Sequence, residues 1–336
     1  MVERGNKRAP GRVMRLKGPL VAPLDKETGA MTDEPENKDR RGFLTCMAWA
    51  GAATVWTIAG GIPRSRLIGS AEAATTDSFT FAQVSDSHLG FNKPVNTDVT
   101  ATFQEALKDT VATKPSFIIH TGDITHLSKP AEFDTGAQLL KSTGLQVYTV
   151  PGEHDVLEED RKSYLNRYGK GTKGDGWYSF NAHGVHFIGL VNVINLTGNG
   201  LGSLGKPQLE WLEKDIKGLT ASTPIVIFAH VPLWIAHKDW GWGTSDGAEA
   251  LTHLARFGSV TVLNGHIHQV MQKVEGHVAF HTARSTAFPQ GVPGVAAGPG
   301  PMPVAAGDLK KYLGIRRVSL VTANAPLAIV DTPLAG

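Results

Sequence analysis

The sequence predicts an α/β domain in which several strands deliver polar side chains to one place. Two observations lead to this expectation. Apolar, strand-like runs alternate along the chain with segments of helical period, as they do in α/β proteins. Five of those runs end at islands rich in Asp, His and Gly, and open α/β sheets bind ligands at the carboxyl ends of their strands. The islands are Asp86-Ser87-His88, Gly122-Asp123, Gly152-Glu153-His154-Asp155, His230 and Gly265-His266-Ile267-His268.

The first half of the domain supplies three of the five strand ends. Residues 79–84 alternate in hydrophobicity and include β-branched side chains, so they predict the opening strand. The other strands expected here are 116–120, 145–150 and two within 178–193, which meet at a turn over 182–184. The helices expected here are 98–111 and 131–141.

The second half supplies the remaining two strand ends. Residues 206–216 form the clearest expected helix, because Leu209, Leu212 and Ile216 fall on one face. A second helix is expected at 247–256. The strands expected here are 224–228, 259–263, 270–274, 278–281, 315–321 and 327–330. Residues 289–307 are rich in Pro, Gly and Ala, which predicts a surface loop or linker.

Length and charge bound the class of protein. The chain has 336 residues, of which 41% are hydrophobic, and this is enough for one large core or two modest ones. Residues 1–74 carry 12 Lys/Arg against 8 Asp/Glu, whereas residues 75–336 carry 21 against 23. The domain therefore has a net charge of 21 − 23 = −2. We expect no dedicated nucleic-acid binding, since that function needs a basic surface.

The islands supply the ligands that a pair of divalent cations requires. Imidazoles suit Fe, Mn or Zn, and carboxylates suit Mn or Mg. A carboxylate such as Asp123 can bridge two cations about 3.5–4 Å apart. His266 and His268, two residues apart, can share one face. A water between two such cations gives hydroxide near neutral pH, which can attack a phosphoryl group. We therefore expect two divalent metal ions, drawn from Mn, Fe, Zn and Mg, and a small phosphoester substrate.

The ordered islands resemble the calcineurin-like metallophosphoesterase superfamily. Its pattern is Asp-x-His, Gly-Asp, Gly-Asn-His-Asp/Glu, a single His and Gly-His-x-His, and the resemblance covers about residues 77–285. The layout is also similar to the branch that includes bacterial cyclic-nucleotide phosphodiesterases. The segment Gly205-Lys206-Pro207-Gln208-Leu209-Glu210-Trp211-Leu212 is similar to a helix start common in the superfamily. The implied fold is a four-layer α/β/β/α sandwich, with two mixed β-sheets flanked by helices.

The resemblance also implies a role for each island residue. Asp86, His88 and His268 would bind the first metal. Asp123 would bridge both metals. His230 and His266 would bind the second. His154 would stand beside the phosphoryl oxygens as an acid or as an electrostatic stabiliser. Asp155 would orient His154.

One position departs from the superfamily pattern, because Glu153 stands where Asn is usual. A carboxylate is a good ligand for hard or borderline cations. It would also lower the net charge of the centre, which could reduce its electrophilicity or change its preferred metal. We expect Glu153 to bind the second metal. The alternative is that its side chain points away and leaves a weak second site.

Other histidines and a tryptophan-rich segment each have two interpretations. A lone histidine is usually structural or exposed, and we expect this of the remaining ones, although His126 could support a nearby ligand. The segment 231–246 lies between two islands and holds Trp234, His237, Trp240 and Trp242. It could be a flap whose tryptophans stack on the substrate, or a packed loop that only supports the site.

Residues 1–74 have the features of a targeting segment. They contain the twin-arginine pattern Asp39-Arg40-Arg41-Gly42-Phe43-Leu44, an uncharged run from Phe43 to Ile62 and the small-residue site Ala71-Glu72-Ala73. This order predicts a signal that the twin-arginine translocase recognises and that is then removed. The product would be periplasmic or secreted, with no stable membrane anchor. The alternative is an uncleaved anchor, since the run is about long enough to span a bilayer.

Two further features agree with export. Met31 lies shortly before the twin arginines, so we expect it to be the true start. The one cysteine, Cys46, lies inside the predicted signal, so the mature domain would have no disulfides and no thiolate chemistry. Export after folding suits a metal enzyme, because the cytoplasm controls which ion fills the site.

The expected function is that of an exported phosphodiesterase with a dinuclear metal centre. A phosphomonoesterase would need extra cationic groups for a dianionic phosphate, but no Arg or Lys directly flanks an island, and Arg284, downstream of the last island, is the one exception we note. A phosphomonoesterase or nucleotidase with the same centre is the first alternative. A non-catalytic metal- or ligand-binding protein, disabled by Glu153, is the second.

Overall fold

The computed structural model describes residues 54–59, 62–67, 79–157, 161–305, 307–320 and 327–334. The twin-arginine pattern, the cleavage site, Met31 and the expected boundary at residue 74 lie outside the described residues and stay predictions. Strand β1 (Thr54–Ala59), which lies within the apolar run, pairs antiparallel with β2 (Ile62–Leu67). No helix in the described ranges is long and apolar enough to cross a membrane.

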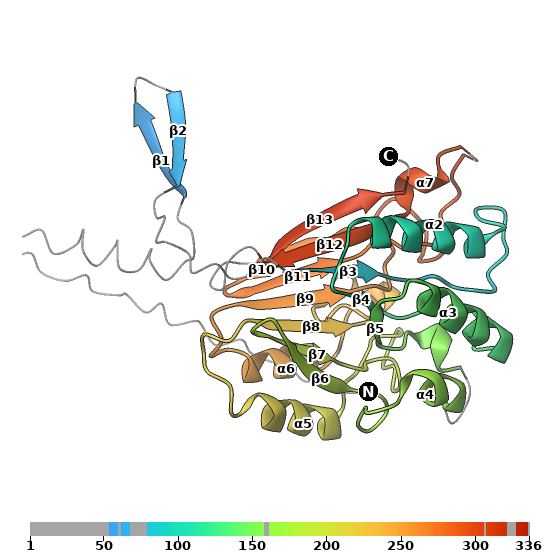
Figure 1. The fold of residues 1–336 in the computed structure, drawn as a ribbon, viewed down its shortest axis with the longest axis horizontal. Helices are drawn as coiled ribbons and strands as arrows, with labels where there is room; N and C mark the ends of the chain where they lie inside the picture. The colour runs from blue at the N-terminus through green and yellow to red at the C-terminus, as the bar shows by residue number, and fades with distance from the viewer. Residues whose placement is uncertain are drawn as a thin grey trace, which may run out of the picture. The chain divides into compact units, whose positions relative to one another are not determined.

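Two β-sheets form the body of the domain (Figure 1). The first sheet has five strands in the order β13-β12-β3-β4-β5. Its strands are β3 (Phe79–Val84), β4 (Phe117–His120), β5 (Gln146–Thr149), β12 (Gly314–Leu320) and β13 (Ala328–Pro333). The sheet is mixed, because β3, β4 and β5 run parallel while β12 pairs antiparallel with β3.

The second sheet has six strands in the order β10-β11-β9-β8-β7-β6. Its strands are β6 (Tyr178–Ala182), β7 (Val185–Gly189), β8 (Ile225–Ala229), β9 (Val260–Asn264), β10 (Gln272–Glu275) and β11 (Val278–Thr282). The four central strands are parallel, and both edge strands are antiparallel to their neighbours. This sheet is therefore mixed as well.

Aromatic and aliphatic side chains from both sheets fill the space between them. The Phe187 ring of the second sheet meets Phe81 and Phe117 of the first edge-to-face, with centroids 5.3 and 5.4 Å apart. Strands β4, β8 and β9 are buried at every position. Burial on both faces explains why these runs are continuously apolar rather than alternating. The shared core holds the strand ends of one sheet against those of the other.

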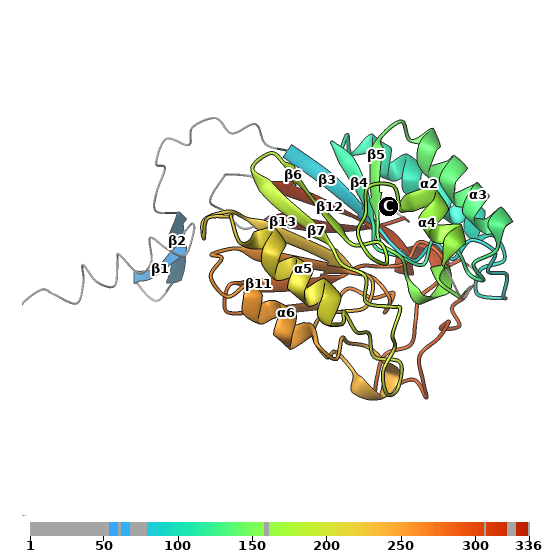
Figure 2. The same cartoon turned by 90° about the horizontal axis from the view of Figure 1, so that it is seen from below.

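Helices cover the outer face of each sheet (Figures 1 and 2). The helices are α2 (Val99–Ala112), α3 (Pro130–Ser142) and α4 (Lys162–Tyr168) on the five-stranded sheet, and α5 (Lys206–Ile216) and α6 (Gly247–His253) on the six-stranded sheet. Phe103 and Phe133 anchor the first set in its own apolar core, and Leu209 and Leu212 anchor the second. The predicted four-layer fold class is confirmed.

The observed elements differ from the expected ones in a few places. β7 ends at Gly189 rather than at Val193, because Val191 N–H leaves the sheet and donates to the Gln208 side chain at 2.8 Å. α6 ends at His253 rather than at Arg256. Neither α4 nor α7 (Leu309–Tyr312) was expected, since both are too short to show a clear helical period.

Candidate metal centre

Five parallel strands bring the islands to one edge of the two sheets. β3, β4 and β5 end shortly before Asp86, Asp123 and Glu153, and β8 and β9 end shortly before His230 and His266. These strands are parallel within each sheet, so their carboxyl ends point the same way. The island side chains form several groups whose ligand atoms lie within 4.8 Å of one another. The predicted convergence on one site is therefore observed.

The first group of ligand atoms, here called the buried cluster, consists of Asp86, His88 and His268. His88 Nε2 lies 3.2 Å from His268 Nε2, which lies 3.3 Å from Asp86 Oδ1. All three residues are at most 2% exposed. Two imidazole nitrogens and one carboxylate oxygen thus converge in the protein interior.

The second group, here called the open cluster, consists of Glu153, His230 and His266. Glu153 Oε2 lies 2.9 Å from His230 Nε2, and Glu153 Oε1 lies 3.0 Å from His266 Nδ1. The side chains of Glu153 and His266 are 26% and 14% exposed, whereas that of His230 is fully buried. Glu153 therefore points into the centre, and each of its oxygens faces one imidazole.

Asp123 lies between the two clusters. Its Oδ2 atom is 3.5 Å from His88 Nε2 of the buried cluster and 3.4 Å from His230 Nε2 of the open cluster. Its Oδ1 atom accepts the backbone N–H of His154 at 2.9 Å. One carboxylate oxygen is therefore available to both clusters at once, which is the position that a bridging ligand needs.

Several buried atoms of this centre lack hydrogen-bond partners. Among the described residues they include Asp86 Oδ2, Glu153 Oε2, His230 Nε2 and His266 Nδ1. The contacts of Glu153 with His230 and His266 are close, but they do not have hydrogen-bond geometry. A buried polar atom without a partner is costly, so four such atoms in one place indicate that a further group satisfies them. Three carboxylates and four imidazoles form a donor set that fits two divalent cations.

The charges of the centre act strongly on its own side chains. Burial would lower the pKa of His230, but Asp123 and Glu153 outweigh it and raise that pKa well above its ordinary value. Burial would raise the pKa of Glu153, but His266 and His230 lower it well below the usual range. A cation bound beside His230 would have to displace the proton that these carboxylates favour, since imidazoles must be neutral to ligate a metal.

Backbone carbonyls orient two of the imidazoles. His230 Nδ1 donates to the carbonyl of Thr121 at 2.7 Å, and His268 Nδ1 donates to the carbonyl of Phe288 at 2.6 Å. Because the proton is held at Nδ1 in each ring, Nε2 can present its lone pair to a cation.

Many residues of the centre have a left-handed backbone. The φ angles of Asp86, His88, Asp123, His266 and His268 are 54°, 42°, 55°, 68° and 53°. These are five of the nine non-glycine residues with positive φ in the described part of the chain. Each such residue costs on the order of 1 kcal/mol, and such strain concentrates at functional sites. The fold therefore enforces these ligand positions.

Two island glycines make room for carboxylates. A Cβ at Gly152 would overlap the Asp123 carboxylate, and a Cβ at Gly265 would overlap Ser85 and lie 2.7 Å from Asp86 Oδ2. Any larger residue at either position would displace a carboxylate of the centre. The two glycines therefore allow the backbone to pass close to the carboxylates of the centre.

His154 borders the centre beside Asp123 and Glu153. Its Nδ1 donates to the carbonyl of His126 at 2.7 Å, so Nε2 is the nitrogen that can serve a substrate. Burial would lower the pKa of His154, but Asp123 and Glu153 raise it above its ordinary value. A histidine in this state can hold a proton close to the centre.

The expected role of Asp155 is wrong. The ring of His154 is held by the carbonyl of His126 and not by the Asp155 carboxylate. Asp155 instead accepts the backbone N–H groups of Ile124, Thr125 and Gly152 at 2.8–3.1 Å. It therefore ties the loop of Glu153 to the loop of Asp123. The two side chains diverge because residues 153–155 form a 3₁₀ turn, which sequence adjacency does not reveal.

The tryptophan-rich segment is largely packed into the protein. Trp242 is 1% exposed, and Trp234 packs against Phe280 with ring centroids 5.2 Å apart. His237 and Trp240 contact each other, with centroids 5.1 Å apart, and are partly exposed. The burial of Trp242 favours a supporting loop at that position, whereas His237 and Trp240 stay candidates for substrate contact.

His120 is a supporting residue that the sequence did not single out. It is fully buried, it contacts Ser87 Oγ through Nε2 at 3.0 Å, and its Nδ1 accepts the N–H of Gly122 at 3.2 Å. Burial lowers the pKa of His120 to about 3, so it is neutral. Its place at the end of a buried strand, just before Gly122-Asp123, is the signal that could have identified it.

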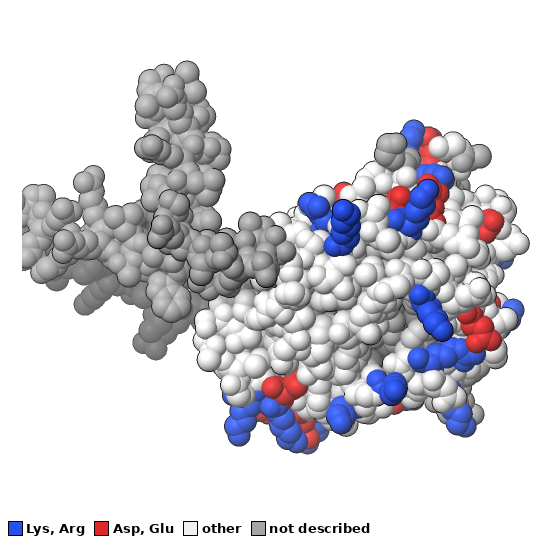
Figure 3. Space-filling model, in the orientation of Figure 1, with Lys and Arg blue, Asp and Glu red and all other residues white. Residues whose placement is uncertain are grey.

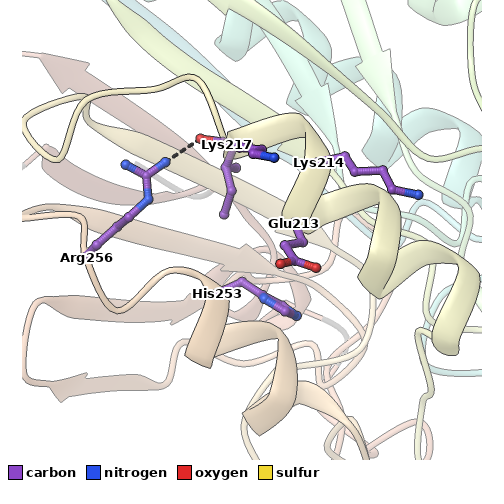
Figure 4. A pocket seen from close by; sticks show the side chains of 6 residues that line it. Glu213, Lys214, Lys217, His253 and Arg256 are labelled. Atoms are coloured by element: carbon purple, nitrogen blue, oxygen red, sulfur yellow. Dashed lines mark hydrogen bonds between the residues drawn. The ribbon is translucent and has the colours of Figure 1, made fainter.

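The surface also carries a pocket and charged side chains that are separate from the metal-ligand groups of the centre. A pocket of about 440 Å³ between α5 and α6 is lined by Glu213, Lys214, Ile216, Lys217, His253 and Arg256 (Figure 4). Arg256 donates to the carbonyls of Leu219 and Ile216, so it caps the end of α5. The face drawn in Figure 3 carries Lys and Arg beside Asp and Glu. Among the described residues, every group that could hold a metal belongs to the centre above or borders it.

Comparison with known proteins agrees with this geometry. The family model of the calcineurin-like phosphoesterases matches residues 79–270. The chain belongs to this family. Calcineurin-like phosphoesterases use two divalent metal ions, and the two clusters provide places for them. The protein is therefore a metal-dependent phosphoric ester hydrolase.

Relatives of this phosphoesterase confirm the expected branch. The chain is 26% identical over 223 residues to a probable glycerophosphodiester phosphodiesterase of Arcobacter nitrofigilis, covering 60% of this chain and 77% of the relative. It is 24% identical over 221 residues to a 3',5'-cyclic-nucleotide phosphodiesterase of Nostoc, covering 62% and 79%. These names favour phosphodiesterase activity within the family.

Solved structures share the fold. A dimetal phosphatase from Danio rerio superposes with a TM-score of 0.55 at 14% identity, covering 75% of this chain and 98% of that one. A purple acid phosphatase from yellow lupin gives 0.53 at 13% identity, covering 77% and 52%. At this identity the likeness concerns the fold alone.

Proposed function

We propose that this phosphoesterase hydrolyses small phosphodiesters, with one cation in the buried cluster, one in the open cluster and Asp123 as the bridge. The observation that carries the proposal is the position of Asp123 Oδ2, 3.5 Å from one cluster and 3.4 Å from the other. Two divalent cations at these places would supply Lewis-acid charge and make a water molecule more acidic.

The residues of the chain have separate tasks in this proposal. The imidazoles of His230 and His268 present Nε2 because carbonyls hold their Nδ1 protons. Glu153 completes the open cluster with both of its oxygens, in the place of a neutral amide. His154 Nε2 donates a proton to the substrate or stabilises negative charge on the phosphoryl oxygens, and the carbonyl of His126 fixes its direction.

The surroundings of the centre favour a diester over a monoester. A dianionic phosphate is usually held by Arg or Lys, often through paired hydrogen bonds. Arg284, which follows the last island in the sequence, donates instead to the backbone carbonyl of Lys311. Two relatives carry names that specify diesters, a glycerophosphodiester in one and a cyclic nucleotide in the other. Both lines of support point to a substrate with a single negative charge.

The test is hydrolysis of bis(p-nitrophenyl) phosphate against p-nitrophenyl phosphate. The purified full chain is stripped of metal and reloaded separately with Mn, Fe, Zn or Mg. We expect faster, metal-dependent cleavage of the diester. A preference for the monoester would instead assign the protein to the phosphatases or nucleotidases, and bound metal without turnover would sink the proposal.

We also propose export through the twin-arginine route, with the active protein in the periplasm or outside the cell. The support is the order of the paired Arg40-Arg41, the apolar run and the small-residue site. Replacing both arginines by lysine should retain the protein in the cytoplasm of an expressing bacterium. Unchanged export of that variant, measured by cell fractionation, would contradict the proposal.

A further inference from the structure

His126 contacts two functional side chains of the centre at once. Its Nδ1 lies 3.4 Å from Nδ1 of His88. Its ring stacks on that of His154, with centroids 4.9 Å apart and planes 18° apart, and it forms a T-shaped pair with Phe91, with centroids 5.2 Å apart. Its backbone carbonyl accepts the Nδ1 proton of His154 at 2.7 Å. His126 therefore joins a side chain of the buried cluster to the histidine that faces the substrate.

The ring of His88 differs from the other cluster imidazoles in how it is held. Both His230 and His268 donate Nδ1–H to a backbone carbonyl. The Nδ1 of His88 has one hydrogen-bond partner among the described residues, and that partner is Nδ1 of His126. A neutral imidazole that offers Nε2 to a cation carries its proton at Nδ1, and this proton needs an acceptor.

We propose that His126 is a positioning residue, which accepts the Nδ1 proton of His88 and so directs Nε2 of His88 into the buried cluster. This assignment requires that His126 carries its own proton at Nε2. His126 then does for His88 what backbone carbonyls do for His230 and His268. The inference rests on the proposed role of His88 as a metal ligand, so the experiment includes a variant of His88.

Two substitutions of His126 separate the acceptor from the ring. His126→Phe keeps an aromatic ring to pack on His154 but has no acceptor. His126→Asn loses the ring but places Oδ1 close to the former position of Nδ1. His277, an exposed turn residue, provides the control substitution His277→Phe. The number and affinity of bound Mn²⁺ ions are measured by calorimetry on the metal-stripped full chain, together with the melting temperature of the metal-free protein.

We expect His126→Phe to weaken one of two Mn²⁺ sites by about 10- to 100-fold, the usual effect of losing a partner of a ligand histidine. His126→Asn and His277→Phe should stay close to the wild type in Mn²⁺ affinity. Wild-type affinity in His126→Phe would overturn the inference. Equal weakening in His126→Phe and His126→Asn would also overturn it, because the ring and not the acceptor would then matter.

The variant His88→Ala separates failure of the inference from failure of the proposed centre. It should bind one Mn²⁺ fewer than the wild type, and retention of both ions would remove the centre and the inference together. Nitrogen-15 NMR of histidine-labelled, Zn²⁺-loaded wild type tests the same point without a substitution at His126. It should show protons at Nδ1 of His88 and at Nε2 of His126, and a proton at Nδ1 of His126 would contradict the inference.

Discussion

The two halves of the centre have the same donor set in different surroundings. Each cluster combines one carboxylate with two imidazoles. The three residues of the buried cluster are each at most 2% exposed, whereas the Glu153 side chain of the open cluster is 26% exposed. Ligand type therefore cannot distinguish the two sites. Their difference must come from burial, from the length of the carboxylate arm and from the partners that hold each imidazole.

This difference suggests a division of labour. The buried cluster is built from a short aspartate and from imidazoles held by Phe288 and His126, so its atoms are in place before an ion arrives. The open cluster uses the longer Glu153 arm, which solvent reaches and which loses more rotamer freedom on binding. We infer that the buried cluster binds its ion more tightly, and the following substitutions test or refine this view.

The largest effect is expected from Asp123→Ala, which removes the ligand shared by both halves. Activity on bis(p-nitrophenyl) phosphate should fall by about 10³-fold or more, beyond the 10²–10³ typical of losing one stabilising donor. Metal analysis should show fewer than two ions per chain. Two tightly bound ions in this variant would mean that the halves are independent sites.

A smaller effect is expected from His154→Ala, which leaves both halves intact. The turnover number should fall by roughly 10²–10³-fold, the range for a lost acid or electrostatic stabiliser. Metal content should stay at two ions per chain, because His154 belongs to neither cluster. A loss of metal instead of turnover would reassign His154 as a ligand.

Glu153→Asn restores the residue usual in the superfamily and acts on the open cluster alone. Removing the charge and shortening the side chain should weaken binding of the second ion by about 10- to 100-fold, the range of affinity losses typical when residues around a metal are replaced. Affinity for the first ion should not change. Glu153→Gln, with equal length and no charge, separates the two causes, and an unchanged second site in both variants would show that Glu153 is not a ligand.

The smallest effect is expected on the pH dependence of stability, through His120, which supports the loop of Asp123. His120 is held neutral by burial, with its pKa lowered from 6.5 to about 3. The unfolded chain takes up this proton as the pH falls below 6.5, so the free energy of unfolding should decrease by about 1 kcal/mol per pH unit on that account. Urea unfolding of the metal-free protein at pH 7.5 and 5.5 should show a smaller decrease for His120→Gln. Equal slopes would exclude the effect.

Much of the fold and of the ligand set could be predicted, because both depend on local patterns. Apolar runs that end in Asp86 or His230 mark buried strands and their carboxyl ends. The helix α5 is predicted by the helical spacing of its apolar residues. The convergence of the islands on one site could be predicted because the carboxyl ends of parallel strands meet at one edge of a sheet.

The rest depends on three-dimensional packing that no local pattern encodes. Asp155 follows His154 directly, yet the 3₁₀ turn sends the two side chains apart. His126 reaches His88 across two separate loops, and the left-handed backbone at Asp86 and His268 is not a conformation that their residue types dictate. Trp242 is buried, whereas the sequence left a substrate-facing flap and a packed loop equally open.

The most direct measurement is a crystal structure of the Mn²⁺-loaded full chain with the ions located by anomalous scattering. We expect two ions, one in each cluster, with Asp123 bound to both and Glu153 bound to the second. A single ion, or a Glu153 side chain turned away from the centre, would contradict this expectation.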